Sequence, residues 1–157
     1  MKFSDSYKNI RLPGYDYHNG WFFITNKTNF SKPYLVRKIH DIAKKELENI
    51  SNISKGVSLD YATIVPTHIH CILIFADSKL LLSEVWRRFK ARTTYYARRK
   101  GLLGKSLWQK NYYEHVIRND KALDRIREYI QNNPLKENLP FNEIYGDQMR
   151  RDRIRLR

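Results

Sequence analysis

Two histidines one residue apart could hold a divalent metal ion between them. His68 and His70 lie in the run YATIVPTHIHCILIF at residues 61–75, in which Pro66 and Thr67 interrupt apolar and β-branched residues. This pattern predicts two strands joined by a tight turn. Residues two apart on a strand share a face and lie about 7 Å apart along it. The two imidazoles can therefore lean onto one ion, with nitrogens about 2.1 Å from it, although paired strand histidines are more often ordinary hydrogen-bonded side chains.

The same alternation assigns the other residues of the second strand to two faces. Ile72 and Ile74 share the face of the histidines, whereas the opposite face carries Ile69, Cys71, Leu73 and Phe75. Both faces are apolar apart from the histidines. The histidine face therefore needs a cover, and a helix is the expected one.

Tyr129 and Asn133 are the residues that such a covering helix could bring to the histidines. A helix is predicted from Lys121 to about Asn133, after a cap at Asn119 and Asp120 and before a proline. Tyr129 and Asn133 are four residues apart and therefore share a side of this helix.

The buried stripe of this helix is formed by Leu123, Ile126 and Ile130, and Tyr129 lies about 60° from Ile126 around the helix axis. Two earlier helices already serve one face of the sheet, so the third is expected on the other face, over His68 and His70. A tyrosine beside an apolar stripe is ordinarily a packing residue, and the helical phase alone does not make Tyr129 catalytic.

The elements that position these residues follow in chain order. A strand is predicted over residues 21–25, and a helix capped at Ser31 or Lys32 has a stripe that begins at Val36 and ends at Ile50. The hairpin follows, with strands at 56–65 and 68–75. Asp77 and Ser78 then open a helix that runs to residue 100, and residues 107–108 and 112–118 form a further strand region. The order of elements predicts an α+β fold.

Length and charge restrict the class of protein. The chain of 157 residues is expected to form one domain over 1–157, with a basic tail from about residue 145. A formal charge of +14 favours a polyanionic partner, and no run approaches the roughly 20 apolar residues of a membrane helix, so nucleic acid is favoured over membrane. One cysteine excludes an intrachain disulfide. The N-terminus lacks a signal-peptide pattern, and a cytoplasmic location is expected.

The second helix is the first candidate for binding DNA. Residues 87–100 contain seven Lys or Arg and no acidic residue. Arg88, Arg92, Tyr95 and Arg99 fall on one helical face, which could follow a phosphate backbone. The ordinary alternative is a solvated charged face. The candidate DNA-binding residues, which include one arginine before the third helix and two in the tail RRDRIRLR, are Arg87, Arg88, Lys90, Arg92, Tyr95, Arg98, Arg99, Arg118, Arg150 and Arg151.

Three motifs in order give a resemblance to a known family. The segments VPTHIHCIL, LWQKNYYEHVIRN and REYIQNNP, together with the opening RLPGYDYHNGWFFIT, resemble the REP-associated tyrosine transposases, within the HUH single-tyrosine transposases of bacterial insertion sequences. The resemblance covers about residues 10–140. It implies a ferredoxin-like (RRM-like) antiparallel sheet with helices on one face and a catalytic helix on the other.

The same resemblance implies roles for particular residues. Tyr129 would be the nucleophile on single-stranded DNA, and His68 and His70 would hold a divalent metal ion, with Asn133 helping to complete the metal site. His115 would lie near the site, whereas Tyr112 and Tyr113 would be structural. Imidazole ligands with an amide or water suit Mn²⁺, and Mg²⁺ would keep several waters.

The sequence therefore predicts a metal-dependent endonuclease and strand transferase that acts on single-stranded DNA, at hairpin-forming repeats, through a 5′-phosphotyrosine. Two alternatives remain at this point. One is a non-catalytic protein that binds single-stranded DNA or RNA on the same fold. The other is an HUH nuclease of the replication-initiator or relaxase type. The chain is expected to act as a monomer or a homodimer.

Overall fold

The computed structural model describes residues 14–132, so Asn133, Arg150, Arg151 and the tail lie outside the described residues. Four strands form one antiparallel sheet in the order β2-β3-β1-β4, with β1 at Gly20–Lys27, β2 at Val57–Val65, β3 at His68–Phe75 and β4 at Tyr113–Ile117. The helices are α2 (Arg37–Glu48), α3 (Leu82–Arg99) and α4 (Asp120–Asn132), and two short 3₁₀ turns, η2 (Asn29–Ser31) and η3 (Ile50–Asn52), follow β1 and α2. The predicted α+β class and antiparallel sheet are confirmed.

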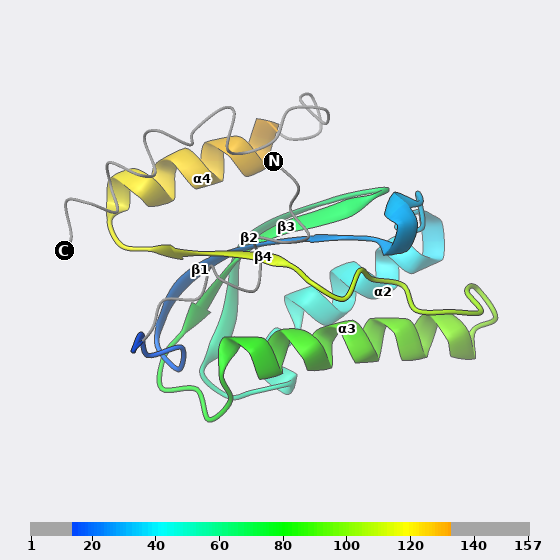
Figure 1. The fold of residues 1–157 in the computed structure, drawn as a ribbon, viewed down its shortest axis with the longest axis horizontal. Helices are drawn as coiled ribbons and strands as arrows, with labels where there is room; N and C mark the ends of the chain where they lie inside the picture. Colours follow the sequence, from blue (N-terminus) through cyan, green and yellow to red (C-terminus); the bar gives the residue numbers. More distant parts are fainter. Residues whose placement is uncertain (1–13, 133–157) are drawn as a thin grey trace.

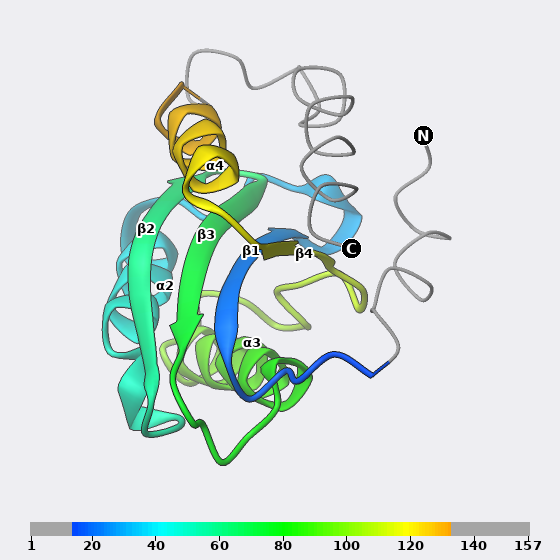
Figure 2. The same ribbon diagram turned by 90° about the vertical axis from the view of Figure 1, so that its left-hand side faces the viewer.

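The helices lie in two layers with the sheet between them. Figures 1 and 2 show α2 and α3 against one face of the sheet and α4 alone against the other. Alternate side chains of β3 point into the two layers. Ile69, Cys71 and Leu73 join the core under α2 and α3, whereas Ile72 packs with the apolar residues of α4. The predicted division of β3 into two faces, and the place of the third helix, are therefore correct.

Two helix starts were predicted wrongly, because tertiary contacts use the residues that looked like caps. Helix α2 begins at Arg37, not near Ser31 or Lys32. Ser31 belongs to η2 instead, and Leu35 is buried with its backbone N–H 3.0 Å from Pro66 O, which keeps the chain extended up to Val36. The chain therefore runs past the β2–β3 turn in extended form before helix α2 begins.

Helix α3 begins at Leu82, four residues later than predicted from Ser78. The Ser78 hydroxyl lies 2.8 Å from the hydroxyl of Ser54 and 2.8 Å from Leu80 O, so it ties the loop after β3 to the loop before β2. The start of α4 was predicted correctly. Asn119 caps it, since its Oδ1 accepts a 2.8 Å hydrogen bond from the backbone N–H of Ala122.

The region before β4 is less regular than predicted. The strand is confined to Tyr113–Ile117, and Trp108 makes only an isolated bridge to Thr28. The indole N–H of Trp108 donates to Thr93 Oγ1 on α3 at 2.7 Å, which fixes this segment against the helix. Among residues 14–132, no helix has the length and apolar character needed to cross a membrane.

Candidate active site

The two histidines lie side by side at the start of β3, beneath α4. The centroids of the His68 and His70 rings are 4.7 Å apart. Each ring has its Nδ1 beside a threonine hydroxyl, at 2.7 Å between His70 and Thr25 and at 3.0 Å between His68 and Thr67. When Nδ1 donates its proton to such a hydroxyl, Nε2 carries the lone pair that a metal ion requires.

His70 is held in its neutral form by its surroundings. It is only 3% exposed, and burial lowers its pKa well below the ordinary value, with the nearby charges of His68 and Lys27 acting in the same direction. Its Nε2 is buried and has no hydrogen-bond partner among residues 14–132. A buried imidazole nitrogen of this kind is unfavourable unless something binds it.

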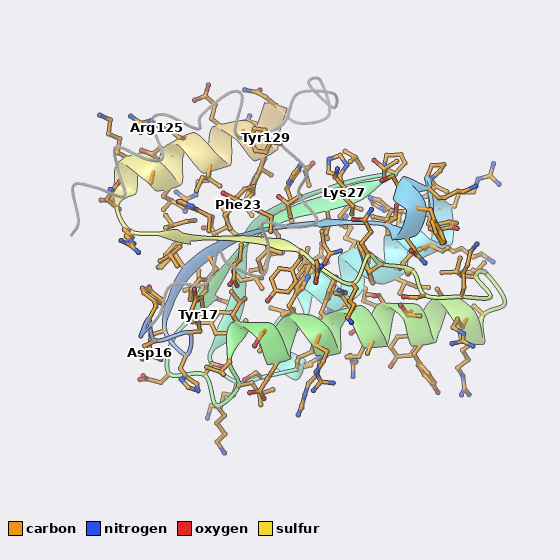
Figure 3. The ribbon with its side chains drawn as sticks, viewed as in Figure 1. Asp16, Tyr17, Phe23, Lys27, Arg125 and Tyr129 are labelled. Atoms are coloured by element: carbon orange, nitrogen blue, oxygen red, sulfur yellow. The ribbon has the colours of Figure 1, made fainter. Side chains whose placement is uncertain are left out.

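Tyr129 comes from α4 to the same place. Its ring centroid lies 5.1 Å from that of His70, edge to face, and its side chain is 4% exposed. Figure 3 shows Tyr129 pointing from α4 toward the sheet. The helical phase predicted this direction, because Ile126 and Ile130 bury the adjoining stripe.

Phe23 of β1 packs against both His70 of β3 and Tyr129 of α4. Its ring stacks on His70 at 5.8 Å and meets Tyr129 edge-on at 6.1 Å, and Tyr113 lies 6.0 Å away on the next strand. Phe23 is completely buried. The site is therefore apolar underneath, which fixes the orientation of the imidazole of His70 and of the phenol ring of Tyr129.

Lys27 adds positive charge to the site. It ends β1 and is paired in register with His68, so it lies on the face covered by α4 (Figure 3). Its charge is one of the causes of the lowered pKa of His70. An amine beside two imidazoles makes this corner of the molecule suited to an anionic group such as a phosphodiester.

The residues present fit half of a metal site. The rings of His68 and His70 lie side by side, and the orphaned Nε2 of the neutral His70 is a nitrogen that an ion would satisfy. Within residues 14–132 there is no cluster of three or more His, Cys, Asp or Glu side chains that could hold an ion alone. Any further ligands of an ion here would have to come from water or from outside this pair of histidines.

The residues of the motif LWQKNYYEHVIRN separate onto the two faces of the sheet. His115 is paired with Phe23 across β1 and β4 and so shares the face of the histidines, one strand further away. Tyr113 packs against Phe23, whereas Tyr112 packs against Trp86 of α3, on the opposite face. The structural roles of the two tyrosines stay predictions.

The basic helix α3 lies across the sheet from Tyr129 (Figures 1 and 2). Residues 87–100 contain no acidic residue, but Arg92 has an acidic partner on another helix, because its Nε donates to Glu46 of α2 at 2.7 Å. Lys90 is also engaged, because its Nζ donates to the carbonyls of Gln109 and Lys110, both at 2.8 Å, and burial lowers its pKa to about 8. Both side chains are therefore already engaged in hydrogen bonds within the protein.

Other basic residues of α3 line a hollow in the surface. Tyr95, Arg98 and Arg99 surround a space of about 730 Å³ with Lys90, Thr94 and the segment at Ser106 and Trp108. Arg99 donates a hydrogen bond to the Tyr95 hydroxyl at 3.0 Å, which restrains the position of the ring. Arg87 and Arg88 are exposed on the same helix, and Arg118 follows β4, where its charge acts on Tyr15. The predicted DNA-binding residues of α3 therefore do not gather at the histidines.

Sequence reasoning missed the threonines and Lys27. Thr25 is adjacent to His70 only because β1 and β3 pair with this register, and the two residues are 45 positions apart. Thr67 was visible next to His68, but its hydroxyl looked like part of the turn. The alternation that predicts strand β1 places Phe23, Thr25 and Lys27 on one face, and this was the available signal.

A strand-borne pair of histidines facing a tyrosine on a covering helix is the arrangement that the resemblance to the tyrosine transposases implied, a class of enzymes that join DNA to a tyrosine. Comparison with known families agrees with that class. Residues 16–133 match the family described as "Transposase IS200 like", and the chain belongs to this family. The predictions of a tyrosine transposase and of a DNA nicking and joining enzyme are thereby confirmed.

Individual relatives support the assignment. An uncharacterised protein of Haemophilus influenzae is 30% identical over 159 residues, with 82% of this chain and 88% of that protein covered. A REP-associated tyrosine transposase of Escherichia coli is 29% identical over 138 residues, with 81% of this chain and 77% of that protein covered. The solved structure of a REP-associated tyrosine transposase bound to a REP hairpin shares the fold, with a TM-score of 0.66, 24% identity and coverage of 82% and 73%.

Proposed function

We propose that the chain cleaves and rejoins single-stranded DNA by attack of the Tyr129 hydroxyl on a phosphodiester. The observation that carries the proposal is the convergence of Tyr129 of α4 on the histidine pair of β3, with ring centroids 5.1 Å apart for Tyr129 and His70. The fold needs an apolar cover at this position, which phenylalanine would supply. A phenol hydroxyl beside the neutral imidazole of His70 and the ring of His68 is instead an arrangement for chemistry.

The reaction balances without an energy source. The Tyr129 oxygen forms a bond to phosphorus, the bond from phosphorus to the 3′ oxygen breaks, and the products are a 5′-phosphotyrosine and a free 3′-OH. The phenol proton leaves and the 3′ oxygen gains one. Because the ester bond is conserved, a different 3′-OH can reverse the step and join the strand to new DNA.

The residues of the site have distinct roles in this step. Phe23 fixes the ring of Tyr129, and Thr25 orients His70 through its Nδ1. His68 and His70, with Asn133, would hold Mg²⁺ or Mn²⁺, which when bound neutralises phosphate oxygens and favours the phenolate of a tyrosine whose ordinary pKa is near 10. Lys27 adds a further positive charge for the phosphate.

The DNA substrate is proposed to be a strand with a hairpin. The relative of known structure is bound to a REP hairpin, and here the basic hollow on α3 lies across the sheet from Tyr129. A strand held at α3 would be a part of the substrate other than the cleaved segment, such as a hairpin stem. Arg87, Arg88, Arg98 and Arg99 are proposed as phosphate contacts there, with Arg118, Arg150 and Arg151 as further contacts.

The deciding experiment traps the covalent adduct. A hairpin-flanking oligonucleotide, labelled on the strand 3′ to the cleavage site, is incubated with wild type and with Tyr129→Phe in the presence of Mg²⁺ or Mn²⁺. Wild type should form an adduct that maps to the peptide containing Tyr129, and Tyr129→Phe should form none while it binds DNA with unchanged affinity. Tyr112→Phe and Tyr113→Phe are the matched controls and should still react.

Two outcomes would contradict the proposal. A nucleotide on Tyr112 or Tyr113 would show that another tyrosine is the nucleophile. Tight binding of the oligonucleotide with no adduct under any metal condition would favour the alternative of a non-catalytic nucleic-acid-binding protein.

A further inference from the structure

An ion pair joins the catalytic helix to the edge of the sheet. Arg127 of α4 donates from Nε to Asp60 Oδ2 at 3.0 Å and from Nη2 to Asp60 Oδ1 at 2.6 Å. The Asp60 side chain is only 13% exposed and that of Arg127 is 41% exposed. Two parallel hydrogen bonds between a planar guanidinium and a carboxylate fix direction as well as distance.

A β-bulge brings Asp60 to this position. Leu59 pairs with Leu73 and Tyr61 pairs with Ile72, so Asp60 is the extra residue between them. Bulges re-aim side chains and are frequent next to active sites. Here the bulged residue carries the carboxylate that α4 binds, and this strand, β2, is hydrogen-bonded directly to β3 with its histidines.

Arg127 reaches a second strand as well. Its guanidinium lies 5.8 Å from the centroid of the Trp21 ring, and Trp21 is on β1. Strands β2 and β1 flank β3 on either side. One side chain of α4 therefore contacts both strands that border the strand of His68 and His70.

The helical phase places Arg127 and Tyr129 on opposite flanks of the buried stripe. At 100° per residue, Arg127 lies about 100° from Ile126 in one direction and Tyr129 about 60° in the other. Apolar burial of Ile126 and Ile130 is not directional, so it permits the helix to roll and slide on the sheet. A directional ion pair on one flank sets the rotation that places Tyr129 on the other flank.

We propose that the Asp60–Arg127 ion pair is a positioning element that fixes α4, and with it the Tyr129 hydroxyl, over His68 and His70. This inference rests on the proposed function of Tyr129. Catalysis is sensitive to such placement, since a shift of about 1 Å in a reacting group can reduce the rate on the order of 100-fold. Neither Asp60 nor Arg127 needs to touch DNA for this effect.

The other face of the sheet supplies a matched control. Arg92 of α3 and Glu46 of α2 form a comparable ion pair, with Nε to Oε2 at 2.7 Å and side-chain exposures of 42% and 12%. Both pairs therefore join an arginine to a largely buried carboxylate between two elements. Only the Asp60–Arg127 pair holds the helix that carries Tyr129.

The experiment compares Asp60→Asn with Glu46→Gln in the full chain. Three quantities are measured: the single-turnover rate of cleavage at saturating DNA, the Kd for the same oligonucleotide, and hydrogen exchange of the backbone in each helix. Asp60→Asn should slow cleavage at least tenfold, leave Kd within twofold and speed exchange selectively in α4. Glu46→Gln should leave the cleavage rate within twofold and speed exchange in α2 or α3.

A further variant separates positioning from simple loss of stability. Asp60→Glu keeps the charge and should recover part of the cleavage rate that Asp60→Asn loses. Equal cleavage rates for Asp60→Asn and Glu46→Gln, or unchanged exchange in α4 of Asp60→Asn, would overturn the inference. If wild type itself forms no adduct, the proposed function fails, and the exchange of α4 then decides by itself whether the ion pair fixes the helix.

Discussion

The face of the sheet under α2 and α3 completely buries Trp86, Phe22 and Phe89, whereas the face under α4 packs a tyrosine against a histidine. The indole N–H of Trp86 has its partner, Asn26 Oδ1, at 2.8 Å. On the other face the Nε2 of His70 is buried with no hydrogen-bond partner within residues 14–132. The indole of Trp86 is thus satisfied within its layer, whereas the Nε2 of His70 is not.

This difference shows how one strand can serve stability and chemistry together. Alternate residues of β3 enter opposite layers, so Ile69 and Cys71 contribute to the large core while His68 and His70 are available to the site. The burial of Cys71 raises its pKa far above the ordinary range, so it behaves as a small apolar side chain rather than a reactive thiol. Changes on the two faces should therefore have separable effects.

The largest expected effect is on the α4 face, where replacing both His68 and His70 with Ala should abolish cleavage. The proposed metal ligands disappear, but the proposed phosphate contacts on α3 remain. The Kd for single-stranded DNA should therefore stay within a few fold of wild type, measured by fluorescence anisotropy alongside the cleavage assay. Undiminished cleavage in the double variant would show that these histidines are not the site.

The second effect is on the opposite face, where Trp86→Ala should lower the free energy of unfolding by about 3–5 kcal/mol. Trp86 is fully buried, stacks on Phe89 at a centroid distance of 4.5 Å and donates to Asn26. Denaturant unfolding measures the loss. The cleavage rate per folded molecule should be nearly unchanged.

Ile130→Ala on α4 provides the comparison for Trp86→Ala. Ile130 is also fully buried, and its truncation should lower the free energy of unfolding by about 2–5 kcal/mol. Because Ile130 lies next to Tyr129 on the buried side of α4, cleavage per folded molecule should fall as well. If both variants reduced cleavage equally, the separation of the two faces would be wrong.

A smaller effect is expected in the salt dependence of DNA binding. If Arg98 and Arg99 each neutralise one phosphate, their joint replacement with Ala should make the slope of log affinity against log salt shallower by about 1.8 on a hairpin stem, at about 0.9 per phosphate, or by about 1.4 on a single strand, at about 0.7 per phosphate. Arg92→Ala should change the slope less, because Glu46 already pairs with it. Titrations at several salt concentrations measure this, and an equal change for Arg92 would contradict the assignment.

The smallest expected effect concerns the start of α4. Asn119→Ala removes the side-chain oxygen that caps the helix and should lower the free energy of unfolding by about 1 kcal/mol. Denaturant unfolding detects a change of this size. Asn119→Asp is the matched control, because it keeps an oxygen acceptor and should retain most of the stability.

The sequence by itself determined the local features of this protein. The strand period placed His68 and His70 on one face, the helical period placed Tyr129 beside the buried stripe of α4, and Asn119 was identified as its cap. These properties repeat over two to four residues, so neighbouring side chains reveal them. The proposed metal contact of Asn133 and the DNA contacts of the tail stay predictions, since they lie outside residues 14–132.

Only the tertiary structure decided which distant residues meet. Thr25 reaches His70 through the pairing of β1 with β3, Asp60 reaches Arg127 through a bulge in β2, and Arg92 reaches Glu46 across two packed helices. The partners in these three contacts are 45, 67 and 46 positions apart. Register, bulges and helix packing result from burying the whole core at once, and no local period in the sequence encodes them.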